Sequence, residues 1–234
     1  MAKYRIRFSK ENNLKYLSHL EIIKTIERAI RRGRLTMAYS EGYHPHPKLS
    51  FGPALAVGIS SMDEYFDLEL VDHDEPERLA KELNGALPEG LRVLAVKKIE
   101  THHPVKSLNA ILNRAAYTVE LNVAAGAQAE IMSQLDQLKE ASEIKIARNT
   151  KEGQKVVNIR PWLHNLSTKK INDNILAVYI VGEIGSGGHL RPEDIIHALP
   201  QPVEIVSIVR TGLWHEEQGR VLKPMDFCDG TGGV

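Results

Sequence analysis

The chain has 234 residues, of which 42% are hydrophobic and 26% charged, and its 30 basic and 30 acidic residues give a formal net charge of zero. This balance excludes a mostly disordered chain and allows one large domain or two small ones. The charged N-terminal sequence and the absence of a long apolar run exclude a signal peptide and a membrane-spanning segment, so we expect a cytoplasmic protein with no membrane partner.

The single cysteine, Cys228, limits the chemistry of the chain. It excludes an internal disulfide, a zinc site of the CxxC type and an iron-sulfur cluster held by this chain alone. We therefore expect no cofactor and no metal.

Charge is unevenly distributed along the sequence. Residues 1–50 hold 11 Lys and Arg against 4 acidic residues, residues 51–90 hold 2 against 10, and residues 145–170 hold 7 against Glu152 alone. A local excess of positive charge can bind a polyanion although the total cancels. The sequence therefore contains two basic segments that are candidates for nucleic-acid contact.

Alternation at the start of the chain predicts a half-buried strand with a cationic outer face, in which Tyr4, Ile6 and Phe8 alternate with Lys3, Arg5 and Arg7. Ser18 and Glu21 have capping-box spacing before a helix that Gly33 ends. The next segments predict a hairpin, a short helix and a strand, over 49–57 with 64–70, 75–83 and 91–99. The expected order is βαββαβ.

The second half repeats this outline. We expect strands over 117–123, 143–148, 175–181 and 203–210, with helices over 127–139 and 192–199. Two split-βαβ units in this order predict an α+β fold of the tandem ferredoxin-like type. The expected domains are 1–100 and 115–212, joined by a linker with a short helix over 101–114 and followed by a flexible, mobile C-terminal tail over 213–234.

The polar side of the first helix is the first candidate site. Lys24, Arg28, Arg31 and Arg32 recur at helical spacing opposite an isoleucine stripe, with Arg34 just beyond and Arg5 and Arg7 on the neighbouring strand. Such a row can neutralise RNA phosphates. The alternative is an ordinary solvated face in which Glu27 is an internal partner.

The stretch from Tyr39 to Gly52 is the second candidate site. Two prolines keep it extended, so that His44 and His46 project to one side, Tyr43 and Phe51 offer rings for stacking on bases, and Lys48 adds a charge. The residues are compatible with a nucleotide-contacting loop, a general acid/base or a metal pair. They are also compatible with a proline-stiffened loop without chemistry.

His19 lies in the first helical turn, where the helix dipole favours a neutral imidazole that could act as a general base in RNA cleavage. The alternative is that His19 has no chemical role and packs against the helix that Ser18 caps. Arg160 begins a predicted short helix at Pro161 and either joins the RNA-binding surface or pairs with the acidic residues 63–77. The glycines from Gly182 to Gly188 indicate a strand-to-helix turn and not a phosphate loop.

Several of these segments resemble one bacterial protein family. The Ser18-His19-Leu20 motif, the arginines from Arg28 to Arg32, the stretch Tyr39 to Lys48, and Glu64-Tyr65 are similar to the radical-SAM-linked protein family, with Glu21 and His44 departing from the usual pattern. The resemblance implies association with a separate radical SAM protein and a setting near RNA or ribosome maturation. It gives no activity.

We therefore expect a non-catalytic module that binds RNA, either tRNA or rRNA, and acts in trans with a radical SAM enzyme. Its RNA-binding residues would be Lys24, Arg28, Arg31, Arg32, Tyr43, His46, Lys48 and Arg160. The first alternative is a metal-independent endoribonuclease with His19 and His46 as catalytic residues. The second is a protein-only adaptor that docks through the acidic segment 63–77.

Overall fold

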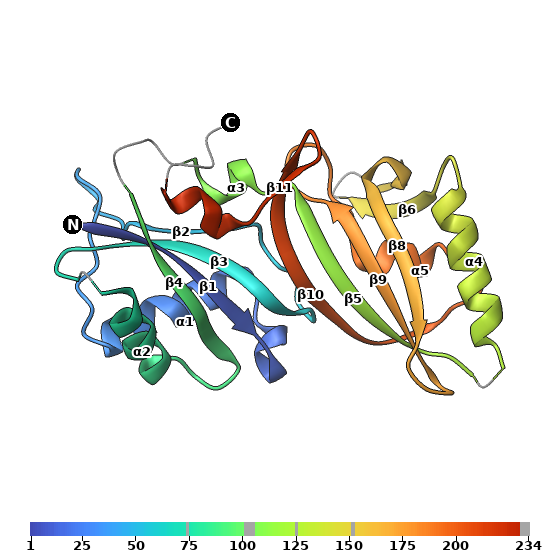
Figure 1. The fold of residues 1–234 in the computed structure, drawn as a ribbon, viewed down its shortest axis with the longest axis horizontal. Helices are drawn as coiled ribbons and strands as arrows, with labels where there is room; N and C mark the ends of the chain where they lie inside the picture. The colour runs from blue at the N-terminus through green and yellow to red at the C-terminus, as the bar shows by residue number, and fades with distance from the viewer. Residues whose placement is uncertain (74, 101–105, 125, 151–152, 230–234) are drawn as a thin grey trace. The chain divides into compact units, whose positions relative to one another are not determined.

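The computed structural model describes residues 1–73, 75–100, 106–124, 126–150 and 153–229, and it has a mixed α+β fold with mostly antiparallel strand pairing (Figure 1). Contacts divide the chain into two compact units. Unit 1 comprises residues 1–112 and 213–234, and unit 2 comprises residues 113–212. Unit 1 is therefore formed by two separate stretches of sequence.

Unit 1 contains the predicted βαββαβ order, with short additional elements. Its elements are β1 (Ala2–Lys10), η1 (Asn12–Tyr16), α1 (His19–Arg32), β2 (Leu49–Phe51), β3 (Ser60–Leu70), α2 (Pro76–Ala86), β4 (Leu91–Ile99), α3 (Leu108–Ile111), the end of β10 (Glu204–Glu217), β11 (Arg220–Leu222) and η3 (Pro224–Asp229). The order β4-β1-β3 is antiparallel, and β2 pairs with β3.

The core of unit 1 lies between this sheet and the helices α1 and α2. Alternation places Tyr4, Ile6 and Phe8 of β1 on the helix side, where they pack with the isoleucine stripe of α1 and with leucines of α2. The predicted capping box is confirmed, because the Glu21 backbone N–H bonds to the Ser18 hydroxyl and the Glu21 carboxylate accepts the Ser18 N–H. Gly33 is the C-cap, as expected.

On the opposite face of this sheet, the prediction of a solvent-facing row of cations is wrong for Arg5 and Arg7. Arg5 is fully buried and donates two hydrogen bonds of 2.8 Å to the Asp67 carboxylate and a third, also 2.8 Å, to the Pro224 carbonyl. Arg7 bonds to Asp63 at 2.6 Å. Both arginines therefore have structural partners, because the neighbouring strand β3 supplies a carboxylate to each and the C-terminal segment also accepts a hydrogen bond from Arg5.

The prediction of a flexible tail is wrong for residues 213–229. This segment forms part of β10, β11 and η3, and its Phe227 and Cys228 are buried. The Cys228 carbonyl accepts the Glu100 N–H at 2.9 Å, and Asp229 pairs with Lys97 at 2.6 Å. Residues 230–234, and the linker residues 101–105, lie outside the described part of the chain.

The main strands of unit 2 follow the order β10-β5-β9-β8. Its elements are β5 (Arg114–Asn122), α4 (Gln128–Glu140), β6 (Lys145–Thr150), β7 (Gly153–Asn158), η2 (Arg160–Trp162), β8 (Leu163–Lys170), β9 (Ile175–Glu183), α5 (Pro192–His197) and the first part of β10. The predicted strand over 143–148 corresponds to β6. However, β6 pairs with β7 in a separate hairpin, and the unpredicted strand β8 pairs with β9 instead.

No helix among the described residues is long and apolar enough to cross a membrane.

Candidate functional site

A cationic ridge lies on the exposed side of α1 and consists of Lys24, Arg28 and Arg31. All three are exposed, and none makes a salt bridge or a side-chain hydrogen bond with another residue in the described part of the chain. An α-helix rises about 1.5 Å per residue, so the ridge places its charges about 6 Å and about 4.5 Å apart along the axis. Such a row can follow the phosphates of a nucleic-acid strand.

The fourth predicted cation of this helix is differently placed. Arg32 is exposed, but its Nε and Nη2 atoms donate to the Ala86 carbonyl at 3.2 and 2.6 Å. Ala86 is the last residue of α2, where backbone carbonyls lack partners within their own helix. Arg32 therefore joins α1 to α2, and its guanidinium is less available than those of the cationic ridge.

The loop over residues 39–47 is braced at its base. The Ser40 N–H donates to the His46 carbonyl, and the His46 N–H donates to the Ser40 hydroxyl oxygen, both at 2.9 Å. A bridge between Tyr39 and Pro47 continues this pairing. Tyr43 is 96% exposed, and the edge of the His44 ring lies against it with 5.1 Å between centroids. The loop thus presents an aromatic ring to solvent on a fixed base.

Lys48, His46 and Phe51 were also expected in this region. Lys48 is partly exposed and pairs with Glu69 at 3.1 Å, while His46 is exposed. Phe51 does not offer a free ring, because it stacks on Phe66 with 5.3 Å between centroids. The loop therefore keeps Tyr43 and His46 as accessible groups, and Lys48 has part of its charge balanced.

Arg160, the predicted contact in unit 2, has a structural role. Its guanidinium donates to the carbonyls of Lys139, Ala141 and Leu163 at 2.8–3.0 Å, so it satisfies the end of α4. Arg148 of the same basic segment pairs with Asp194 and lies over the Trp162 ring. These contacts leave the second basic segment with fewer available cations than its composition suggests.

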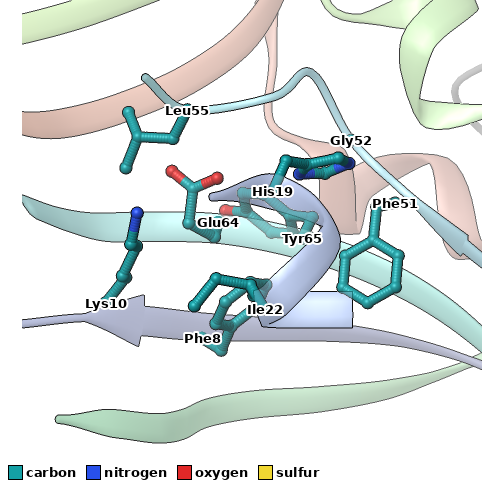
Figure 2. A pocket seen from close by; sticks show the side chains of 9 residues that line it. All are labelled: Phe8, Lys10, His19, Ile22, Phe51, Gly52, Leu55, Glu64 and Tyr65. Carbon is teal, nitrogen blue, oxygen red and sulfur yellow. The ribbon is translucent and has the colours of Figure 1, made fainter. Parts of the chain in front are cut away.

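A pocket at the first turn of α1 contains His19 (Figure 2). The space in it that water can occupy is about 20 Å³, and part of the pocket is open to solvent. The walls are largely apolar and aromatic, and Lys10 and Glu64 extend into it from β1 and β3. Lys10 is 2% exposed and donates to the Leu17 carbonyl at 2.9 Å, whereas Glu64 is 8% exposed. The residues around the pocket are Phe8, Ile22, Phe51, Gly52, Leu55 and Tyr65.

This pocket brings an imidazole, a carboxyl group and an amine together in apolar surroundings, which is the type of arrangement that supports proton transfer. The ring of His19 meets the Phe51 ring edge to face at 5.7 Å, which orients the imidazole. Burial and the neighbouring Asp63 raise the pKa of Tyr65, so its hydroxyl stays protonated. His46 does not line the pocket, and the structure therefore does not assemble the expected pair of histidines there.

Sequence reasoning identified His19 but missed Lys10 and Glu64. Glu64 lies two residues before the buried Phe66, and Lys10 lies two residues after the buried Phe8, beyond an irregularity in the pairing of β1 with β3. An ionisable residue at an inward position of an alternating strand is a signal that was present in the sequence. Among the described residues, no group of three or more His, Cys, Asp or Glu side chains is placed to hold a metal ion.

The acidic segment 63–77 is only partly a surface. Asp63, Glu64 and Asp67 are buried, and Glu69 contacts Lys48. Its exposed acids among the described residues are Asp72, Glu75 and Glu77. A docking surface on this segment would therefore consist of its exposed acids, because Asp63, Glu64 and Asp67 face the sheet's own arginines and the pocket, and the adaptor alternative stays a prediction.

Residues 3–192 match the family described as "Uncharacterized protein conserved in bacteria (DUF2344)". No curated protein matches the chain.

One solved structure shows a likeness of fold at low sequence identity, and a second has a lower score. A chain of the "Crystal Structure of a Cbf5-Nop10-Gar1 Complex" is 12% identical with a TM-score of 0.50, covering 90% of this chain and 48% of that one. A chain of the "Structure of H/ACA RNP bound to a substrate RNA containing 2'-deoxyuridine" is 12% identical with a TM-score of 0.47, covering 89% and 46%. This chain spans about half the length of either.

Proposed function

We propose that this chain, which belongs to the family of uncharacterized proteins conserved in bacteria (DUF2344), is an RNA-binding protein. The observation that carries the proposal is the cationic ridge. Three cations share one exposed helix face, and none forms a salt bridge with a carboxylate among the described residues, although Lys24 is close enough to Glu21 to help lower the pKa of that carboxyl group. Cations that are solvated, aligned and unpaired release phosphate counterions when a polyanion binds, and this release is the main source of non-specific affinity.

The braced loop supports RNA as the polyanion. Sequence-selective RNA recognition uses unstacked bases that lie on aromatic rings, and each stacked base contributes about 1–3 kcal/mol. Tyr43 is 96% exposed on a loop whose base is held by hydrogen bonds, so little ordering is needed when a base stacks on it. His46 on the same loop can donate a hydrogen bond to a base or phosphate.

We infer further that each unit is a ferredoxin-like repeat. In unit 1 the strand order is β4-β1-β3 with β2 on the far side of β3, and in unit 2 it is β10-β5-β9-β8. With the β6-β7 hairpin treated as an insertion, the main strands in chain order are β1, β2, β3 and β4 in unit 1 and β5, β8, β9 and β10 in unit 2. In both units the fourth strand lies beside the first, the first beside the third, and the third beside the second. The support is this shared order and the helix that follows each first and third main strand.

We also propose that the protein acts with a separate radical SAM enzyme. The support is the resemblance of its N-terminal motifs to the radical-SAM-linked family, together with a single buried cysteine that cannot hold a cluster alone. Affinity purification of the tagged chain with and without ribonuclease treatment tests this. A radical SAM protein that is retained after the treatment supports direct association, and its absence in both samples contradicts it.

Salt dependence of RNA binding tests the central proposal. Fluorescence anisotropy with a labelled structured RNA, measured from 50 to 300 mM KCl, should give a log-log slope of about −3 or steeper if the cationic ridge contacts three phosphates. Each of Lys24→Ala, Arg28→Ala and Arg31→Ala should reduce the slope by about one. The matched control is Arg92→Ala, an exposed arginine on β4. A flat slope in the wild type contradicts RNA binding through this surface.

The pocket around His19 favours a second candidate function, metal-independent RNA cleavage. The favouring observation is that Lys10 and Glu64 are placed beside His19. Incubation with RNA in the presence of EDTA should then release fragments with cyclic phosphate ends. His19→Gln should abolish the cleavage while His46→Gln should not, because His46 lies outside the pocket. Intact RNA after prolonged incubation with the wild type excludes this function.

A further inference from the structure

A polar groove lies where the end of α1 meets the beginning of α2, and it is separate from the pocket that contains His19. The space in it that water can occupy is about 290 Å³, and part of the groove is open to solvent. Its apolar floor includes Leu35 and Leu70. The polar side chains around it are Arg34, Thr36, Asp72, His73, Arg78 and Glu82.

Arg34 enters this groove from an unusual backbone conformation. Its φ is 55°, in the left-handed region that favours glycine, and it directly follows Gly33, which is right-handed with φ −70°. Two hydrogen bonds hold the turn, from the Arg34 N–H to the Arg31 carbonyl at 3.0 Å and from the Leu35 N–H to the Ile30 carbonyl at 3.1 Å. The sequence thus keeps a long cationic side chain where glycine would be unstrained.

Arg78 and His73 share one carboxylate across the groove. Arg78 Nε donates to Glu82 Oε1 at 2.8 Å, which leaves both terminal nitrogens of the guanidinium for other acceptors. His73 Nε2 lies 3.3 Å from Glu82 Oε2, and hydrogen bonds from Arg78 and His73 lower the pKa of Glu82. The His73 side chain is 7% exposed, and its Nδ1 has no hydrogen-bond partner among the described residues.

The acids of the groove differ in how they are paired. Glu82 is satisfied by Arg78 and His73, whereas Arg34 makes no salt bridge in the described part of the chain. Asp72 is the other acid, and it is exposed to solvent. Among the described residues, the groove therefore offers the Arg34 guanidinium and the two terminal nitrogens of the Arg78 guanidinium. These are donors that bind phosphate, since arginine matches phosphate oxygens with two parallel N–H groups.

We propose that this groove is a phosphate seat that continues the cationic ridge, in which Arg34 and Arg78 grip a phosphate of the RNA strand. The proposal rests on the proposed function and adds a defined end point to the RNA path, because Arg34 is three residues beyond Arg31. A phosphate here would lie between the turn that follows α1, which contains Arg34, and α2, which contains Arg78. A free phosphate compound offers the same oxygens as an RNA phosphate, so pyrophosphate and RNA are used as separate probes.

Arg34→Gly is an informative variant because it removes the guanidinium and the backbone strain together. Its thermal midpoint should equal or exceed that of the wild type, so weaker binding cannot be attributed to unfolding. Its salt slope for RNA should fall by about one, which corresponds to about eightfold weaker binding at 0.1 M salt. Gln218→Gly is the matched control, because Gln218 has a φ of 50° outside the groove and should bind RNA as the wild type does.

A second arm uses inorganic pyrophosphate and NMR. Pyrophosphate should compete with RNA and shift the amide signals of Arg34 and His73 in the wild type, and Arg34→Gly should abolish the shift. If the wild type binds RNA but Arg34→Gly keeps the same slope and affinity, the phosphate seat is overturned while the proposed function stands. If the wild type binds pyrophosphate at these residues but no RNA, the groove holds a small phosphate ligand and RNA binding is refuted. Binding of neither probe overturns both.

Discussion

The buried pair of Arg5 and Asp67 allows a quantitative test of how unit 1 is stabilised. Arg5 is 0% exposed and Asp67 is 3% exposed, and two bonds of 2.8 Å join them. Arg5→Met leaves the Asp67 carboxylate buried without its cation and the Pro224 carbonyl without its donor. Removing one partner of such a pair costs about 3–5 kcal/mol. With about 2–4 °C for each kcal/mol at this chain length, the midpoint of thermal unfolding should fall by about 6–20 °C.

The double variant separates the effect of the stranded charge from that of lost packing. Arg5→Met combined with Asp67→Leu removes both charges and should recover most of the loss, because a well-packed apolar pair can replace a buried ion pair at little cost. Urea unfolding followed by fluorescence and circular dichroism measures both variants. A loss below about 1 kcal/mol for Arg5→Met would refute the reasoning, as would a double variant less stable than the single one.

Three further predictions concern the helix cap, the buried thiol and a crowded glycine. Ser18→Ala should lower the free energy of unfolding by about 1 kcal/mol, because the Glu21 N–H loses its capping hydroxyl; urea titration measures this, and Ser18→Asp should retain most of the cap. Burial raises the pKa of Cys228 from 9.0 to about 11, so the unfolded chain releases this proton first and stability should decrease between these pH values by about 1.4 kcal/mol per pH unit. Below pH 9 the thiol is protonated in both states and contributes no slope, and Cys228→Ala should remove its share of the alkaline loss; an equal loss in that variant argues against the buried thiol as the cause. Gly188→Ala should destabilise unit 2 by about 1–3 kcal/mol, because the added Cβ would lie 2.0 Å from Trp162 Nε1 at a φ of 155°, and an unchanged thermal midpoint would contradict the close contact.

Local patterns in the sequence predicted the elements of unit 1 well. The capping residues Ser18 and Glu21 define the beginning of α1, and the strand predicted over 91–99 matches β4. These features depend on neighbours within a few residues, so a single sequence contains them. The exposed placement of the cationic ridge follows in the same way from its helical spacing opposite buried isoleucines.

The features that escaped prediction depend on distant partners. Strand β8 has mostly polar residues because it has a neighbour on one side in the sheet, so its sequence lacks a strong apolar alternation. Arg5 looked like a surface cation because its partners, Asp67 and Pro224, lie 62 and 219 positions away. Likewise, nothing near Lys10 in the sequence indicates that Glu64 and His19 lie beside it.

The discontinuous make-up of unit 1 has a consequence for synthesis on the ribosome. The residues that complete it, 213–229, are translated after the whole of unit 2. Until they emerge from the exit tunnel, Arg5 lacks the Pro224 carbonyl and the edge of β4 lacks η3. A nascent chain therefore has an unfinished N-terminal sheet while its second unit is being made, and premature termination shortly before residue 213 would leave that sheet permanently uncapped.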